Sequence, residues 1–202
     1  MGIATDKVID QMIENRRKFE DFCFSLSDEE LDRPVPESTW LVRDFAAHLA
    51  TLDPGMAQLF EATVRNERMT TPDGGTFDVD AHNEPLVVAR RTWTMARVFE
   101  EGRTKRAALI ELLRGITDEQ TQHQMWFEAD AKRAAGQLPF GLFLAGWAWH
   151  DPIHVADMIR GLPERAGDPD VKAWLDNPFV KGYQGAMNKP ATKRYERSSC
   201  DT

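Results

Sequence analysis

The chain has 202 residues, of which 42% are hydrophobic, and its formal net charge is −8 at pH 7. This length and hydrophobic share fit one domain with a continuous core and argue against wholesale disorder. The negative charge, with no basic face evident in the sequence, argues against binding to nucleic acid.

Two further features bear on the compartment. No apolar run reaches the roughly 20 residues that a membrane-spanning helix needs, and the first residues lack the charged and then apolar segments of a secretion signal. Cys23 and Cys200 lie far apart and lack the spacing of a zinc ribbon. We therefore expect a cytoplasmic protein with two free thiols and no membrane contact.

The first part of the chain carries two helical patterns. Apolar residues recur every three or four positions from Asp6 to Leu26, which predicts an amphipathic helix. Ser27–Glu30 has the form of a capping box and predicts a further helical turn, which the prolines of Arg33–Pro36 end. The same apolar spacing then predicts a second helix from Leu41 to about Leu59.

The second part predicts two more long helices. Met69–Asp80 is expected to be a loop, and Asn83-Glu84-Pro85 is expected to open a third helix that runs to about Ile116. A capping-box pattern, Thr117–Gln120, heads a short or irregular stretch. Phe140–Leu162 is predicted to be the fourth helix. The third helix carries arginines beside glutamates, which we interpret as a solvated face: Arg90, Arg91, Arg97, Arg103 and Arg106.

Four long amphipathic segments with no strand of period two predict an all-α four-helix bundle. We assign this bundle to residues 1–163. Residues 164–202 are expected to form a C-terminal extension that contains one short helix, Asp168–Leu175, and is mobile after about Asn188.

The five histidines divide by context. His82 and His123 lie in polar surroundings and are expected at the surface, whereas His48, His150 and His154 fall on the apolar stripes of the second and fourth helices. Positions i and i+4 of a helix differ by about 40° around the axis and about 6 Å along it, so two imidazoles so placed can converge on one ion.

A third imidazole from a facing helix would complete three ligands and leave one position open, as in catalytic metal sites. The alternative is that the three are core histidines satisfied by hydrogen bonds, which requires a partner for each buried ring. We predict that His48, His150 and His154 bind a divalent metal ion, with zinc or nickel expected first and iron as an alternative.

Pro152 stands inside the histidine pair. Its missing N–H and its ring disfavour a straight helix, because they affect the carbonyl of Ala148 four residues earlier. We predict a kink between Trp147 and Asp151, with the freed carbonyls bonded to water or side chains. If the metal site is formed, the coordinating nitrogens of His150 and His154 must lie within about 4 Å of each other.

Three short motifs resemble those of the DinB/YfiT-like superfamily. Trp40–Ala50 is similar to its second-helix motif, and His150–His154 to its ligand pair on the fourth helix. Asp80–Asn83 resembles the Asp-x-x-Asn of the branch of mycothiol-dependent maleylpyruvate isomerases. The resemblance covers about Asp6 to Leu162. It implies a four-helix bundle in which His48, His150 and His154 are the ligands.

One departure from the motif concerns the start of the second helix. Leu41 stands where the family commonly has threonine or serine after its tryptophan. The helix cap is therefore expected to be lost, or shifted to Ser38 or Thr39.

The resemblance also implies a function. Characterised family members are isomerases or transferases that use mycothiol, bacillithiol or glutathione-like thiols, which implies a metal-dependent enzyme that activates a small thiol. Metal-assisted hydrolysis is a rival interpretation, and a non-catalytic bundle that binds a small ligand or partner is another. The expected partners are a small-molecule substrate and a thiol, with a homodimer as an additional expectation.

No residue beyond the metal ligands is assigned a catalytic role from the sequence. Asp53, Asp151 and Asp157 are candidates to hold a ligand imidazole in one tautomer. The simpler interpretation of each is a solvated charge or a helix cap.

Overall fold

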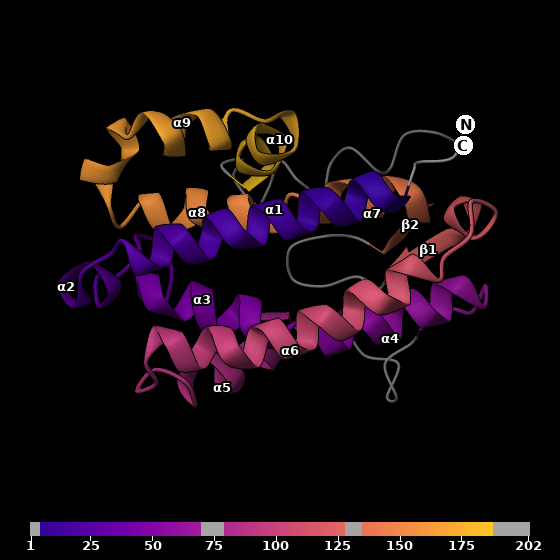
Figure 1. Ribbon diagram of the computed structural model, residues 1–202, viewed down its shortest axis with the longest axis horizontal. Helices are drawn as coiled ribbons and strands as arrows, with labels where there is room; N and C mark the ends of the chain where they lie inside the picture. The colour runs from indigo at the N-terminus through magenta and orange to yellow at the C-terminus, as the bar shows by residue number, and fades with distance from the viewer. Residues whose placement is uncertain (1–4, 70–78, 128–134, 188–202) are drawn as a thin grey trace.

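The computed structural model describes residues 5–69, 79–127 and 135–187. Its long helices form a four-rod bundle of the expected kind, in which two rods are each built from two consecutive helices (Figure 1). The rods are α1 (Thr5–Phe24), α3 with α4 (Val42–Thr51, Asp53–Val64), α6 (Met95–Arg114), and α7 with α8 (Phe140–Trp147, His150–Ile159).

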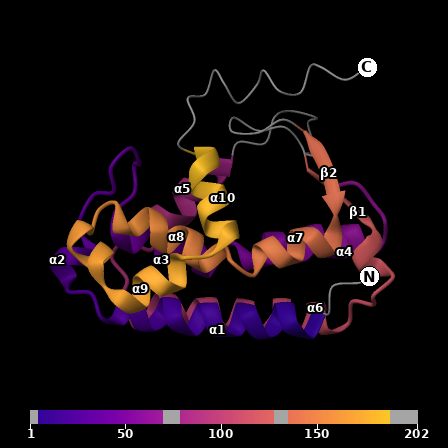
Figure 2. The same ribbon diagram turned by 90° about the horizontal axis from the view of Figure 1, so that it is seen from above.

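Shorter elements surround the bundle. In Figure 1, α1 and α6 run side by side along the long axis, and the view turned by 90° shows α9 and α10 stacked against α8 (Figure 2). The short helices are α2 (Asp28–Leu31), α5 (Val79–Val88), α9 (Pro169–Leu175) and α10 (Pro178–Met187), with 3-10 turns η1 (Gln120–Gln122) and η2 (Pro163–Gly167). No helix among the described residues is long and apolar enough to cross a membrane.

The core forms where the apolar stripes of the rods meet. Phe19 of α1 and Phe99 of α6 are both buried, and their rings pack edge to face with centroids 6.0 Å apart. Gly102 lets α6 approach α3 closely, because a Cβ at this position would lie 3.2 Å from the Cα of Ala50. This contact brings the second and third rods together around the middle of the bundle.

Both predicted capping boxes are confirmed. The Ser27 hydroxyl accepts from the Glu30 amide, and Glu30 Oε2 accepts from the Ser27 amide at 2.8 Å. Thr117 and Gln120 make the equivalent pair ahead of η1.

The side-chain cap of α3 is lost, which is one of the two outcomes expected from Leu41. Neither Ser38 nor Thr39 caps the helix; Leu41 occupies the cap position and has no side-chain acceptor. The carboxylate of Asp44 instead accepts from the Leu41 amide at 2.9 Å. The reverse half of a capping box therefore replaces the missing hydroxyl, and the helix begins where the sequence placed it.

The third predicted helix is broken, so that expectation was wrong. α5 ends at Val88, and α6 begins at Met95 after the Thr94 side chain has accepted from the Arg97 amide. Pro85 therefore lies inside α5 rather than in a first turn. The break folds α5 against α3, and it leaves Ala89 and Ala96, which the single-helix interpretation had buried, exposed.

A hairpin corrects the expectation of no strands. β1 (Gln124–Phe127) pairs antiparallel with β2 (Gly136–Pro139), and Gln124 lies opposite Pro139. Each strand has only four residues, which is too short for a period of two to stand out in the sequence. The hairpin joins the third rod to the fourth at one end of the bundle (Figure 2).

The C-terminal segment contains more structure than predicted. The expected short helix is confirmed as α9, which Asp168 caps through the amides of Asp170 and Val171. α10 was not predicted. The residues after 187 and most of the predicted loop at 69–80 lie outside the described residues, and the domain boundary near residue 163 stays a prediction.

Candidate metal centre

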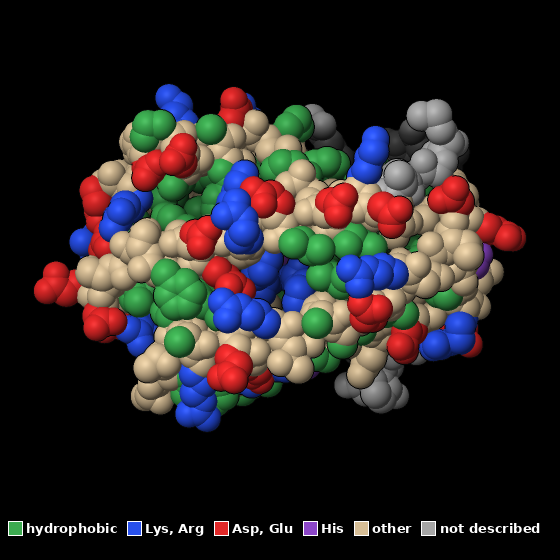
Figure 3. Space-filling model, in the orientation of Figure 1, with side chains coloured by type: hydrophobic (Ala, Val, Ile, Leu, Met, Phe, Trp, Pro, Cys, Tyr) green, Lys and Arg blue, Asp and Glu red, His purple; other side chains and the backbone are tan. Residues whose placement is uncertain are grey.

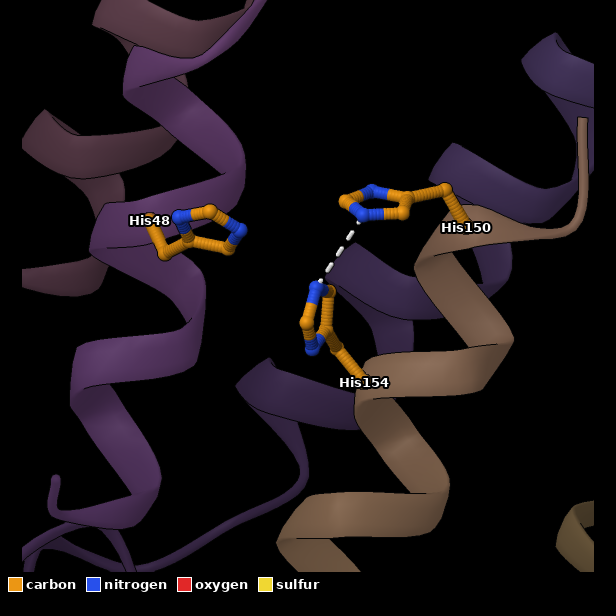
Figure 4. A group of neighbouring side chains, drawn as sticks. All are labelled: His48, His150 and His154. Atoms are coloured by element: carbon orange, nitrogen blue, oxygen red, sulfur yellow. Dashed lines mark hydrogen bonds between the residues drawn. The ribbon is translucent and has the colours of Figure 1, made fainter. Parts of the chain in front are cut away.

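Three imidazoles meet between the second and fourth rods. His48 projects from α3, His150 and His154 project from α8, and the rings point toward one another (Figure 4). One nitrogen from each ring lies within 4.8 Å of the other two. His150 Nε2 and His154 Nε2 are 3.2 Å apart, within the separation of about 4 Å that two ligands of one ion require. Two nitrogens of a tetrahedral zinc site with bonds of about 2.0–2.1 Å would be ~3.4 Å apart.

Aromatic rings form the wall around the three imidazoles. Trp147 stacks on His150 with centroids 4.1 Å apart and planes 17° apart. Trp40 lies 5.1 Å from His48, and Phe45 lies 5.6 Å from His154. His48 is 7% exposed and His154 is 8% exposed. The site therefore has a largely apolar lining, in which its polar nitrogens need partners.

Asp157 holds the ring of His154. Its Oδ2 lies 3.2 Å from His154 Nδ1, one helical turn along α8. A carboxylate at Nδ1 favours a proton on that nitrogen and leaves the lone pair of Nε2 facing His150. Asp157 is therefore in the position predicted for an aspartate that orients one of these imidazoles, and the role of His154 as a ligand stays a prediction.

The environment of His150 favours its neutral form. Burial lowers the pKa of His150 well below its ordinary value, and the nearby charges of His154, His48 and two arginines lower it further. Its Nδ1 atom is buried and has no hydrogen-bond partner among the described residues. The facing Nε2 atoms of His150 and His154 can share at most one proton, whereas a cation between them would satisfy both lone pairs.

The predicted kink at Pro152 is confirmed as a break between two helices. α7 ends at Trp147 and α8 begins at His150. The carbonyl of Ala148, which Pro152 deprives of its helical donor, accepts from Asn15 Nδ2 at 2.6 Å. The freed carbonyl is therefore bonded to a side chain, as expected, and His150 occupies the first position of the new helix.

A buried charge cluster of Arg16, Asp53, Arg106 and Asp151 adjoins the histidines. Arg16 makes two hydrogen bonds to Asp151, from Nε at 2.8 Å and from Nη2 at 3.0 Å. Arg106 Nε donates to Asp53 at 2.8 Å, and its Nη2 lies 3.6 Å from Asp151 Oδ1. All four residues are buried. In Figure 3, basic side chains are visible in a recess between α1 and α6.

The charge cluster corrects two expectations. Arg106 belongs to the interior and not to a solvated face, and Asp53 and Asp151 hold arginines instead of imidazoles. Burial alone would raise the pKa of Asp151, but Arg16 and Arg106 outweigh it and hold that pKa below its ordinary value. For Asp53 burial prevails over the two arginines and raises the pKa.

An outer ring of contacts ties α5 to the site. Trp40 Nε1, beside His48, donates to Glu84 Oε2 of α5 at 2.7 Å. Arg91 follows α5 and pairs with the buried carboxylate of Asp44 at 2.8 Å. In the Asp80–Asn83 motif, Asn83 is buried, whereas the side chain of Asp80 lies outside the described residues.

The other two histidines stand apart from the three-histidine cluster. His82 is exposed, as expected. His123 is partly buried, and its Nδ1 lies 3.0 Å from the carbonyl oxygen of Thr63, so the surface expectation was wrong for that residue.

Sequence reasoning missed three polar residues that surround the site. Asn15 and Arg16 fall three and four positions after Met12, on the buried stripe of α1. Arg106 falls four positions after Gly102, on the buried stripe of α6. Their helical spacing is the signal that could have found them, because a polar residue on an apolar stripe requires a buried partner.

Fold and site together define a DinB/YfiT-type four-helix bundle with a three-histidine cluster between its second and fourth rods. The chain belongs to the family of the mycothiol maleylpyruvate isomerase N-terminal domain, whose model matches residues 14–150. This range includes His48 and His150 and stops short of His154.

A solved structure has the same fold. It is YfiT from Bacillus subtilis, described as a probable metal-dependent hydrolase with an unusual four-helix bundle topology. The TM-score is 0.63 at 22% sequence identity, and the match covers 81% of this chain and 87% of YfiT. No curated protein matches the chain.

Proposed function

We propose that this chain is a metal-dependent enzyme that holds a divalent cation through His48, His150 and His154 and activates a small thiol for transfer or isomerisation. The observation that carries the proposal is the convergence of three imidazoles, with two Nε2 atoms 3.2 Å apart and one nitrogen from each ring within 4.8 Å of the others.

The donor set suits particular ions. Neutral imidazoles favour zinc, nickel and iron over magnesium and calcium, which prefer oxygen. We expect zinc or nickel first and iron as the alternative. Three protein ligands are the number typical of catalytic zinc sites, where a fourth position remains for water or substrate.

When bound, the cation supplies a coordination position at which a thiol or a water molecule loses its proton more readily. The chain prepares this position in two ways. Asp157 keeps His154 in the tautomer that offers Nε2, and Trp147 fixes the plane of His150 by stacking.

The thiol would come from a second molecule. Cys23 is 1% exposed, and burial raises the pKa of its thiol far above the ordinary value. Cys200 lies outside the described residues. Membership in a family named for a mycothiol-dependent isomerase supports a low-molecular-weight thiol of the mycothiol or bacillithiol kind. Such a thiol and a small substrate fit the cytoplasmic location expected from the sequence.

Metal-assisted hydrolysis is the second candidate. It is favoured by the likeness to YfiT, which is described as a probable metal-dependent hydrolase. The same three histidines would then serve a cation that activates water. The sequence has no His-Glu-x-x-His motif, so peptide hydrolysis of that type is not proposed.

A non-catalytic bundle is the third candidate. Histidines kept only for packing should bond to backbone carbonyls or similar partners. His150 and His154 instead face each other, and the other nitrogen of His154 faces a carboxylate. This arrangement favours a cation over simple packing.

The test uses full-length protein purified without an affinity tag and loaded with cobalt. A panel of small thiols should change the cobalt absorption spectrum through sulfur coordination, and His150→Ala should abolish this change. If no thiol changes the spectrum but esters or amides are hydrolysed, water activation replaces thiol activation. If the protein binds no cobalt, the non-catalytic interpretation replaces both.

A further inference from the structure

Residues of α1 hydrogen-bond to the chain on both sides of His150, at Ala148 and at Asp151. Asn15 donates to the carbonyl of Ala148, two residues before His150. Arg16 makes its two hydrogen bonds to Asp151, the residue after His150. Asn15 and Arg16, which are consecutive in α1, thus form hydrogen bonds on both sides of His150, one of the predicted ligands. α1 itself supplies none of the three histidines.

The amide of Asn15 has a fixed orientation. Its Oδ1 accepts from Trp174 Nε1 of α9 at 2.9 Å and from Gln11 Nε2 at 3.1 Å. Because an indole N–H can only donate, the oxygen must face Trp174 and the NH₂ group must face Ala148. Asn15 is 0% exposed, so its bond to the freed carbonyl is shielded from competing solvent.

The turn that carries His150 depends on these hydrogen bonds for its position. His150 is the first residue of α8, and no continuous helix precedes it, because Pro152 cannot donate to the Ala148 carbonyl. His154 is different: it lies within α8, and Asp157 holds its ring from the same helix. The 3.2 Å approach of the two Nε2 atoms therefore depends on how the break is held, and this affects His150 more than His154.

We propose that Asn15 and Arg16 are positioning residues for His150, and that α9 takes part in the metal site through the chain of contacts from Trp174 to Asn15 to Ala148. This inference rests on the proposed metal function. It assigns a role in ligand geometry to a helix beyond the predicted bundle boundary, and it makes Asn15 the residue through which that helix acts.

The test compares Asn15→Leu with two other variants of the full chain. Trp174→Phe keeps an aromatic ring but removes the N–H that orients Asn15. Leu113→Ala is the matched control, because Leu113 is fully buried near the C-terminal end of α6, beyond the charge cluster. Two quantities are measured on each protein: the Kd for cobalt with its absorption spectrum, and amide hydrogen exchange of the metal-free form.

We expect Asn15→Leu to weaken cobalt binding by about 10- to 100-fold, the usual effect of losing a group that orients a ligand, and to shift the cobalt spectrum. Trp174→Phe should give a smaller change in the same direction. Leu113→Ala should leave both unchanged even if it lowers the melting temperature more. In the metal-free form, the amides of Trp149 and Ile153, which donate to the carbonyls of Gly146 and Trp149 on either side of the break, should exchange faster in Asn15→Leu than in the control.

Wild-type cobalt affinity, spectrum and exchange in Asn15→Leu would overturn the positioning role. Failure of the proposed function gives a different pattern, in which the wild-type protein binds no cobalt or binds it equally well after His154→Ala. In that case the exchange of Trp149 and Ile153 decides whether α1 holds the break, since this measurement needs no metal.

Discussion

Two clusters of buried polar side chains lie next to each other in this bundle, and their buried polar atoms are compensated in different ways. The charge cluster contains two arginines and two aspartates, whose charges compensate in ion pairs, although Asp53 Oδ1 and Arg106 Nη2 have no hydrogen-bond partner among the described residues. The three-histidine cluster contains no fixed charge, and two of its nitrogens face each other at 3.2 Å. The clusters adjoin at His150 and Asp151, which are consecutive in the sequence.

The difference shows which cluster has its charges balanced without an added ligand. A buried ion pair must supply its own counter-charge, or the desolvation of each ion is left uncompensated. A neutral imidazole can be buried at lower cost but still needs a partner for its lone pair. We therefore expect the charge cluster to govern folding stability and the histidine cluster to govern the response to metal.

Removal of one buried charge should change the stability more than any other substitution proposed here. Arg106→Met should lower the free energy of unfolding by about 3–5 kcal/mol, because it leaves Asp53 buried without its partner. Urea denaturation measures this change. Arg17→Met is the control, since Arg17 pairs with Glu14 and Asp21 on the exposed face of α1 and its loss should change the stability far less. Equal effects of the two variants would contradict the distinction between interior and surface charge.

The second prediction concerns the metal response. Zinc at about a 100-fold excess over its Kd should stabilise the protein by about 2.7 kcal/mol, because it binds the folded state alone. Chelation should remove this gain, and His154→Ala should show no response to zinc. The melting temperature, followed with and without chelator, measures the effect. An unchanged melting temperature after verified metal removal would count against the bridging of α3 and α8 by an ion.

The third prediction concerns pH in the metal-free protein. The folded-state pKa of His150 is lowered by burial, so below about pH 6.5 the unfolded chain binds a proton that the folded chain excludes. The stability that comes from keeping His150 neutral is therefore fully present above about pH 6.5. It is lost as the pH falls, and the free energy of unfolding then decreases by up to about 1.4 kcal/mol per pH unit.

Unfolding of wild-type protein and of His150→Gln, measured between about pH 7 and pH 5, tests this sign. His150→Gln should show a shallower decline, because it removes the titrating ring. An identical pH dependence in both proteins would mean that His150 does not remain neutral in the fold.

The fourth prediction concerns Asp157, whose substitution should change metal binding more than stability. Asp157→Asn should weaken metal binding by about tenfold, which corresponds to about 1.4 kcal/mol, because the amide holds the Nδ1 proton of His154 less strongly than the carboxylate. The metal-free stability should change by less than about 1 kcal/mol, since this pair is only partly buried. Zinc titration beside thermal unfolding measures both, and a stability loss that matches the affinity loss would contradict the assignment.

Features that depend on short spacing could be predicted from the sequence. Helical periodicity predicted the rods, and the four-residue interval between His150 and His154 was enough to bring two imidazoles to one point on α8. The kink at Pro152 followed from local chemistry as well, because a proline removes a donor whatever surrounds it. The place of His48 on the apolar stripe of another helix made it the third candidate ligand, and the family resemblance supported all three residues and the four-helix bundle.

The pairing of polar residues across the bundle, in contrast, follows from how the helices assemble. Nothing in the spacing of α1 indicates that Arg16 pairs with Asp151, or that Asn15 reaches the Ala148 carbonyl, since these partners lie more than a hundred positions away. The break before α6 has the same origin, because the contact of α5 with α3 overrides a pattern that suits one long helix. Local propensity is a weak constraint compared with burial, and burial is a property of the assembled rods.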